Sequence, residues 1–150
     1  MVKISSVNIY IETDKNSAKK QKRAFGTIVE FVLKDDREAY SGICGACIAT
    51  GNQLALIALI RGLEKLNRAC TVTVHMENRY VTESIRLGRV QAWAESGWKT
   101  VKGKPIANAD EWQRLYELMQ IHEIRIADVV LHPYRDKLME KIEEKLNSQK

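Results

Sequence analysis

The feature that most constrains the fold of this chain is a long apolar segment, residues 53–66, which lies between β-strand patterns. Apolar side chains cover most of the circumference that this segment would have as a helix, which predicts a buried helix. Thr50 or Asn52 could cap it, since both side chains accept hydrogen bonds from backbone N–H groups. Residues 71–75 are β-branched and predict a strand, which a helical crossover favours in a parallel pairing with an earlier strand.

Three strand patterns precede this helix. Residues 7–14 alternate, with Val7, Ile9 and Ile11 on one face, and residues 25–33 and 39–48 follow after polar turns. Short connections favour antiparallel pairing. The first third of the chain is therefore predicted to be a three-stranded antiparallel meander.

The second half of the chain alternates between helix and strand patterns. Helices are predicted over residues 79–87, 90–96, 111–122 and 136–146, and a fifth strand over residues 124–131. This order of elements predicts an α/β fold, in which helices pack on a mixed five-stranded sheet. One domain is expected to span residues 1–150.

The charge of the chain favours a polyanionic partner. The net charge is +5 and the isoelectric point is about 9.1. Five basic residues fall within nine positions: Lys15, Lys19, Lys20, Lys22 and Arg23. No apolar run approaches the roughly 20 residues needed to cross a bilayer, and the first residues lack the apolar core of a signal peptide. We therefore expect a cytoplasmic protein without a membrane partner.

Three cysteines, Cys44, Cys47 and Cys70, give an odd count, which argues against a disulfide framework. Cys44 and Cys47 form a Cys-x-x-Cys pair, but the sequence lacks the second pair that a zinc site needs. A redox pair would begin a helix, whereas this pair lies in or beside a predicted strand. Buried thiols are the favoured interpretation, and His75 is expected in the core or on the sheet surface.

A basic loop leads into a helix between residues 97 and 115. Asn108 or Ala109 precedes an acidic first turn, which suits a helix N-terminus. The loop carries one tryptophan and three lysines: Trp98, Lys99, Lys102 and Lys104. Cationic side chains beside an aromatic ring suit a phosphate backbone, although an ordinary solvated loop has the same composition.

Three acids stand at or just beyond the ends of predicted strands: Asp14, Glu77 and Asp136. Ligands of open α/β sheets bind at the C-terminal ends of central strands. Carboxylates gathered there would suit Mg²⁺, which prefers oxygen ligands. Solvent-exposed acids at strand ends are the alternative.

Motifs along nearly the whole chain occur in the order of a known family. They are Thr13-Asp14, Phe25-Gly26, Thr50-x-Asn52, residues 72–81, Gly97-Trp98-Lys99-Thr100, and Asn108-x-Asp110-x-Trp112-x-x-Leu115. In this order they resemble type I ribonuclease H, which cuts the RNA strand of RNA–DNA hybrids. The resemblance implies a sheet of order 3-2-1-4-5, helices on both faces, and an RNA–DNA hybrid as partner.

The resemblance also implies a metal site that lacks one carboxylate. The family uses four carboxylates to hold two Mg²⁺ or Mn²⁺ ions, which activate water and stabilise the leaving oxygen. Asp14 fits the first position, with Glu12 as the alternative, and Glu77 and Asp136 fit the third and fourth. Ala55 stands at the second position, where the family has Glu, so fewer ions than the family norm are possible.

The resemblance assigns binding roles to further residues. Thr50, Asn52, Arg79 and Asn108 match positions near the phosphates and sugars of the hybrid, where 2′-hydroxyls distinguish RNA from DNA. Trp98 and the loop lysines would contact nucleic acid in the same way. The loop before the last acid is shortened, and His132 in it matches a histidine thought to help product release; a surface histidine is the alternative.

Two main functions remain in competition, and a protein-interaction domain is a third alternative. One is metal-assisted hydrolysis of the RNA strand of a hybrid, and the other is nucleic-acid binding by a module that has lost catalysis. The substitution at position 55 separates them, because alanine neither binds a metal nor orients water.

Overall fold

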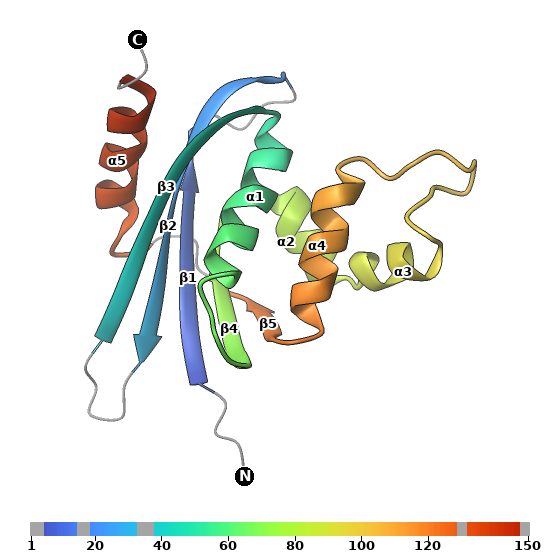
Figure 1. Cartoon of the computed structure of the whole chain (residues 1–150), viewed down its shortest axis with the longest axis horizontal. Coiled ribbons are helices and arrows are strands. Elements are labelled where there is room, and N and C mark those ends of the chain that lie inside the picture. The colour runs from blue at the N-terminus through green and yellow to red at the C-terminus, as the bar shows by residue number, and fades with distance from the viewer. Residues whose placement is uncertain (1–4, 15–18, 33–37, 129–131, 148–150) are drawn as a thin grey trace.

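A five-stranded sheet with helices on both faces forms this protein (Figure 1). The computed structural model describes residues 5–14, 19–32, 38–128 and 132–147. The strands are β1 (Ser5–Thr13), β2 (Gln21–Val32), β3 (Glu38–Ala49), β4 (Cys70–His75) and β5 (Glu123–Ile126). Their order in the sheet is β3-β2-β1-β4-β5, which confirms the predicted topology.

Strand directions follow from the connections between strands. β1, β2 and β3 pair antiparallel, whereas β4 pairs parallel to β1 and β5 pairs parallel to β4. The helix α1 (Gly51–Leu63) provides the crossover from β3 to β4. Parallel pairing brings the C-terminal ends of β1 and β4 to the same edge of the molecule.

The main core lies between the sheet and α1. Val7, Ile9 and Ile11 alternate onto the α1 side of β1 and are buried, as their spacing predicts. Gly62 lets α1 approach the sheet closely, since a Cβ at this position would lie 3.0 Å from Cγ2 of Thr27. The hydroxyl of Thr27 donates to the carbonyl of Ala58 at 3.1 Å, which satisfies a buried polar group.

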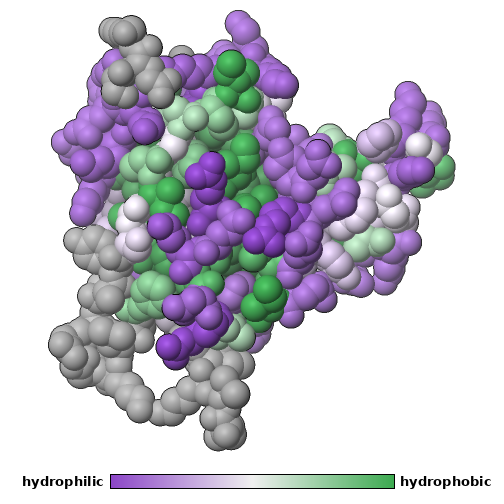
Figure 2. Space-filling model, in the orientation of Figure 1, coloured by the Kyte–Doolittle hydropathy of each residue, from purple (hydrophilic) through white to green (hydrophobic). Residues whose placement is uncertain are grey.

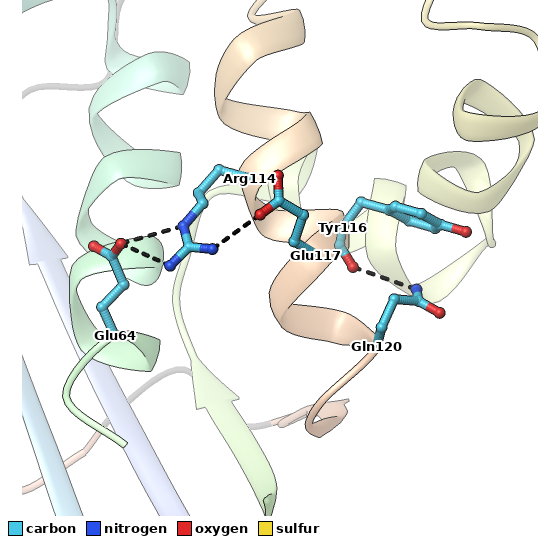
Figure 3. A network of polar contacts seen from close by, with 5 residues as sticks. All are labelled: Glu64, Arg114, Tyr116, Glu117 and Gln120. Carbon is cyan, nitrogen blue, oxygen red and sulfur yellow. Dashed lines mark hydrogen bonds and ion pairs between the residues drawn. The ribbon is translucent and has the colours of Figure 1, made fainter. Parts of the chain in front are cut away.

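Three further helices lie on the α1 side of the sheet: α2 (Arg79–Arg86), α3 (Arg89–Glu95) and α4 (Ala109–Met119). At the exposed end of the contact between α1 and α4, Arg114 donates two hydrogen bonds to Oε2 of Glu64 and one to Glu117 (Figure 3). These groups are half exposed, so their ion pairs add little stability. They fix how the two helices meet at the surface.

The other face of the sheet is covered by α5 (Arg135–Asn147) (Figure 1). Leu138 packs there against Tyr10 and Ile28. Gly26 permits this contact, because a Cβ at position 26 would lie 2.9 Å from Cδ2 of Leu138. The close packing of α5 on the sheet therefore explains why the Phe25-Gly26 motif contains a glycine.

The structure corrects two strand boundaries. β5 ends at Ile126, whereas a strand was expected to residue 131; residues 129–131 lie outside the described part. β2 begins at Gln21, four residues before the predicted start, so Arg23 belongs to a strand and its side chain is buried. Its guanidinium donates to the carbonyls of Ala49 and Lys19, at 2.9 and 2.6 Å. Arg23 is therefore a structural cation and does not add to a basic surface; Lys15 lies outside the described residues.

Within the described residues, none of the helices combines the length and apolar character that crossing a membrane requires.

Candidate functional site

A cavity of about 230 Å³ opens where β1 and β4 end beside the start of α1. Its lining includes two of the predicted acids, Asp14 and Glu77, together with Glu12, Ala55 and Asn78. This is the edge at which parallel strands of open sheets bind ligands. The structure therefore brings Asp14, Glu77 and the substituted position 55 to one site.

The third predicted acid, Asp136, lies in the first turn of α5 and is exposed. It lines a separate, more open cavity of about 480 Å³, and Asp14 lines this cavity as well. Asp14 thus lies between Glu77 and Asp136. Among the described residues, no three or more Cys, His, Asp or Glu side chains form a group that could hold a metal ion. The carboxylates lie near one another but do not form a preassembled metal site. Metal binding stays a prediction.

The alternative acid, Glu12, is on β1 and is only 6% exposed. Its Oε2 lies 2.8 Å from Nε2 of His132, whose side chain is 1% exposed. Nδ1 of His132 accepts a hydrogen bond from the backbone N–H of Tyr134, so Nε2 carries the proton that is donated to Glu12. Burial raises the pKa of Glu12 above 4.5, and the Glu77 carboxylate raises it further, whereas His132 and Arg135 lower it.

His132 therefore lies buried at the site. The interpretation of an exposed surface histidine is wrong, because both ring nitrogens have partners. A role in product release stays a prediction.

The start of α5 is tied to the rest of the site by side chains beside His132. Arg135 donates from Nη1 to Oε1 of Glu77 at 3.0 Å. Tyr134 donates from its hydroxyl to Oε2 of Glu30 on β2. These contacts fix the entry of α5, and with it Asp136, relative to the sheet.

Residues predicted to bind substrate gather at the start of α1. Thr50 is the N-cap of this helix and accepts from the backbone N–H of Gln53 at 3.2 Å, which confirms one of the two predicted caps. Asn52 instead accepts from Nδ2 of Asn78 at 3.0 Å. Asn78 caps α2, of which Arg79 is the exposed first residue. Thr50, Asn52 and Arg79 thus lie along two helix N-termini beside the cavity.

The basic loop projects from the body of the molecule between α3 and α4 (Figure 1). Its three lysines, Lys99, Lys102 and Lys104, are all exposed. Backbone hydrogen bonds and a bridge between Lys99 and Pro105 give it a defined shape. In Figure 2 the projection is mainly coloured as hydrophilic and neutral residues, as expected for a solvated, charged surface.

Aromatic packing anchors this loop. Trp98 has a positive φ of 65° and meets the ring of Tyr116 edge-on, with 5.8 Å between ring centroids. Trp112 is buried and packs against Trp93 and Tyr80. The expectation that the tryptophans pack the helices against the loop is confirmed. Asn108, the N-cap of α4, has a left-handed backbone (φ 59°) and makes no side-chain cap hydrogen bond, so its amide is not used in capping.

Cys44 and Cys47 do not form a joint metal or redox site. Cys44 lines a cavity with Leu138 and Lys141 on the α5 face, whereas Cys47 packs on the main core on the other face. Burial raises the pKa of all three thiols, which disfavours reactive thiolates. The prediction of buried thiols for the pair is wrong for Cys44, which is exposed, and holds in part for Cys47, which is half-buried; Cys70, outside the pair, is buried. The ring of His75 stacks on that of Tyr10, with 4.3 Å between the ring centroids. This agrees with the expected position of His75 in the core or on the sheet surface.

The sequence model of the RNase H family matches residues 5–136. The chain belongs to the RNase H family. Ribonuclease H of Rhodospirillum rubrum is 44% identical over 80 residues, which are 53% of this chain and 48% of that protein. Ribonuclease H of Syntrophus aciditrophicus is 37% identical over 96 residues, which are 64% of this chain and 54% of that protein. The chain spans about half the length of these relatives.

Solved RNase H structures share the fold. LC9-RNase H1, a type 1 RNase H with the type 2 active-site motif, matches with a TM-score of 0.75 and 19% identity; the match covers 100% of this chain and 76% of that one. The foamy viral protease-reverse transcriptase in complex with RNA/DNA hybrid matches with a TM-score of 0.67 and 12% identity, over 96% of this chain and 20% of that one. At these identities the likeness concerns the fold alone.

Sequence reasoning missed the buried partners of the RNase H site. The burial of Glu12, its contact with His132 and the contact between Tyr134 and Glu30 were not expected. The sequence does contain a usable signal, because Tyr10 and Glu12 on β1 and Asp14 directly after it are spaced by two and would share a face of an extended chain.

Proposed function

We propose that this protein binds RNA–DNA hybrids and hydrolyses their RNA strand with the help of Mg²⁺ or Mn²⁺. The observation that carries this proposal is the cavity where β1 and β4 end, which Asp14 and Glu77 line in a chain of the RNase H family. A cytoplasmic location, the expectation from the sequence, belongs to the same proposal.

The donors at the site suit a hard divalent cation. Asp14 and Glu77 share one cavity, Asp14 and Asp136 share the next, and carboxylate oxygens are the ligands that Mg²⁺ and Mn²⁺ prefer. These three residues would hold the metal, which when bound would activate water and stabilise the leaving oxygen. One or two ions are compatible with this donor set.

Side chains beside the cavity and on the basic loop would bind the hybrid. Thr50, Asn52 and Arg79 would contact phosphates and sugars beside the cavity, and short polar side chains suit the 2′-hydroxyls of an RNA strand. Asn108 would add an amide that is not used in capping. Lys99, Lys102 and Lys104, with Trp98, would hold the hybrid without regard to sequence. The foamy viral relative in fold was solved with an RNA/DNA hybrid, which supports the choice of partner.

The test is cleavage of an end-labelled RNA–DNA hybrid by the pure protein with Mg²⁺ or Mn²⁺. We expect cleavage of the RNA strand only, and its loss in Asp14→Asn. Duplex DNA of the same sequence is the control substrate. An intact hybrid at high protein concentration, with either metal, would exclude the enzymatic function.

A second function is favoured by one observation, the alanine at position 55 in the wall of the cavity. It is hybrid binding without catalysis. In that case the protein would retain the hybrid in a gel-shift assay, in a salt-dependent manner, and leave its RNA strand intact.

A further inference from the structure

The edge strand β3 presents backbone groups to which a further strand can bind. Among the described residues, β2 is the one strand that pairs with β3, so the second side of β3 is an edge of the sheet. In Figure 1, β3 lies beside α5 at this edge. Residues 39–49 contain neither a charged residue nor a proline, which are the usual means of protecting such an edge from other chains. The edge therefore suits the addition of a strand from a partner.

The hydrogen bonds of β2 identify the residues of β3 that face this edge. The N–H of Asp14 donates to the carbonyl of Ala24 at 3.2 Å, so Ala24 directs its backbone groups toward β1. Because these groups alternate along a strand, those of Phe25 face β3, where Phe25 pairs with Gly45. The residues on either side of Gly45, and every second residue beyond them, direct their N–H and carbonyl groups away from β2. These outward residues include Gly42, Cys44, Ala46 and Ile48.

A cavity of about 230 Å³ lies beside this edge, between β3 and α5. Ile28 and Leu138 contribute to its apolar wall, and Gly42 and Cys44 line it on β3. A Cβ at Gly42 would have no neighbouring atom within 4 Å, so there is room above this residue. Side chains of directly opposite residues on paired strands lie on the same face of a sheet. A partner residue opposite Gly42 would therefore direct its side chain toward the cavity.

Lysines of α5 border the same cavity. Lys137 and Lys141 line it, and both are exposed. Burial raises the pKa of the Cys44 thiol, and the charges of Lys141 and Lys145 oppose this rise, which places both charges near the edge strand. Glu144 also acts on this thiol and lies 3.5 Å from Lys141. The three lysines together outweigh the charge of Glu144, so this side of α5 attracts negatively charged side chains.

The same lysines disfavour a second copy of this chain at the edge. If two β3 strands paired antiparallel, their two-fold axis would place both copies of α5 on the same face of the joined sheet. The lysines of the two copies would then approach each other, and like charges repel. An acidic segment from a different protein would instead find opposite charges beside the edge. The charge of α5 therefore favours an acidic partner.

We propose that the open edge of β3 binds an extended acidic segment of a partner protein as a further strand of the sheet. The backbone of the segment pairs with Gly42, Cys44 and Ala46. One apolar side chain of the segment enters the cavity between β3 and α5, and carboxylates two positions away from it meet Lys137 and Lys141. The recognised pattern is acid-x-apolar-x-acid. This interaction uses none of the residues that line the cavity where β1 and β4 end, and it does not depend on hydrolysis.

The test is the binding of a fluorescein-labelled peptide to the full chain, measured by fluorescence anisotropy. The peptide is a short run of threonines in which a central valine has a glutamate two positions before it and another two positions after it. We expect saturable binding. Absence of saturation by this peptide would overturn the proposal.

Two modified peptides test whether the segment binds as a strand. One carries N-methyl groups on the valine and glutamate nitrogens, and the other carries them on the neighbouring threonine nitrogens. Successive N–H groups of a strand point to opposite sides, so only one of the two sets faces β3. We expect one peptide to lose about 10-fold in affinity relative to the other, because its hydrogen bonds to β3 cannot form. Equal affinities of the two peptides would overturn the proposal.

Variants of the protein test the edge and the charges separately. Ala46→Pro removes an outward N–H and leaves the bonds to β2 in place, so peptide affinity should fall about 10-fold. Lys137→Glu combined with Lys141→Glu should also lower it about 10-fold, because attraction becomes repulsion. Lys65→Glu combined with Arg68→Glu makes the same change of net charge at exposed residues elsewhere. An equal loss in this control would overturn the proposal, even if Ala46→Pro did not fold.

The oligomeric state separates this proposal from self-association. Light scattering during size-exclusion chromatography measures it for the wild type and for Ala46→Pro, without peptide. We expect the same molar mass for both proteins, since the edge awaits a different partner. A wild-type dimer that Ala46→Pro converts to a monomer would show that a second copy occupies the edge, and would overturn the proposal.

Discussion

Nε2 of His132 lies 2.8 Å from Oε2 of Glu12, although 120 positions separate these residues in the chain. Both side chains are buried, and the contact joins the first strand to the entry of the last helix. Removal of the imidazole would leave a buried carboxylate without its donor. We therefore expect His132→Ala to lower the free energy of unfolding by about 2–4 kcal/mol.

Urea denaturation at neutral pH, followed by circular dichroism, measures this loss. His132→Asn, which retains a side-chain N–H donor, should lose less. If His132 served product release alone, His132→Ala would slow turnover of the hybrid and leave the denaturation midpoint unchanged.

A second buried histidine makes stability depend on pH. Nδ1 of His122 accepts from the backbone N–H of Cys70 at 3.1 Å, which only the neutral ring can do. Burial lowers the pKa of His122 below 6.5, so the unfolded chain binds a proton more readily than the folded one. The stabilisation is complete above pH 6.5 and is lost as the pH falls through the lowered folded-state pKa.

The measurement compares urea unfolding between pH 7.5 and 5. His122→Asn keeps an acceptor for Cys70 and cannot titrate, so its stability should fall less over this range. His75, whose pKa burial and His132 also lower, is present in both proteins and cancels in the comparison. Parallel pH profiles for the two proteins would contradict the assignment to His122.

Gly26 sets the distance between the sheet and α5. A methyl group there would meet the side chain of Leu138, and crowding in a packed core costs about 1–3 kcal/mol. Gly26→Ala should therefore lower the thermal unfolding midpoint. Leu138→Ala in the same chain relieves the crowding, so the two changes should be less than additive in a double-mutant cycle. Strict additivity would mean that the two side chains do not meet.

The three loop lysines, Lys99, Lys102 and Lys104, should act on nucleic acid through charge alone. Their joint replacement by alanine is expected to weaken hybrid binding for every sequence and to reduce the slope of log K against log salt by up to about 3. Fluorescence anisotropy at several salt concentrations gives both values. Lys65 and Lys141, exposed on other parts of the surface, are the control pair, and their replacement should leave the slope nearly unchanged.

The sheet could be predicted because its signals are local. The alternation of Val7, Ile9 and Ile11 identifies the buried face of β1, and the apolar helix before residue 71 implies a parallel crossover. The start of β2 was harder to predict, because a charged side chain in it is buried through hydrogen bonds to backbone carbonyls. Arg23 looks like a loop residue in the sequence, and only the carbonyls of Ala49 and Lys19 explain its burial.

The site was predictable in part for the same reason. Asp14 and Glu77 each follow a strand, and parallel pairing places them at one edge. The contact of Glu12 with His132 depends on how α5 docks, which no local pattern encodes. The Cys-x-x-Cys spacing also misleads, since on a strand its odd offset sends the two thiols to opposite faces.

The contact between Glu12 and His132 also bears on how the molecule assembles. Long-range contacts form late, since the chain must first lose the entropy of closing a large loop. During synthesis the ribosome releases β1 to β5 before His132 and Asp136, so the meander and the crossover can form while the site lacks its last helix. The nascent chain thus acquires a sheet before Asp136 can reach the other acids, and the proposed site is complete only when α5 docks.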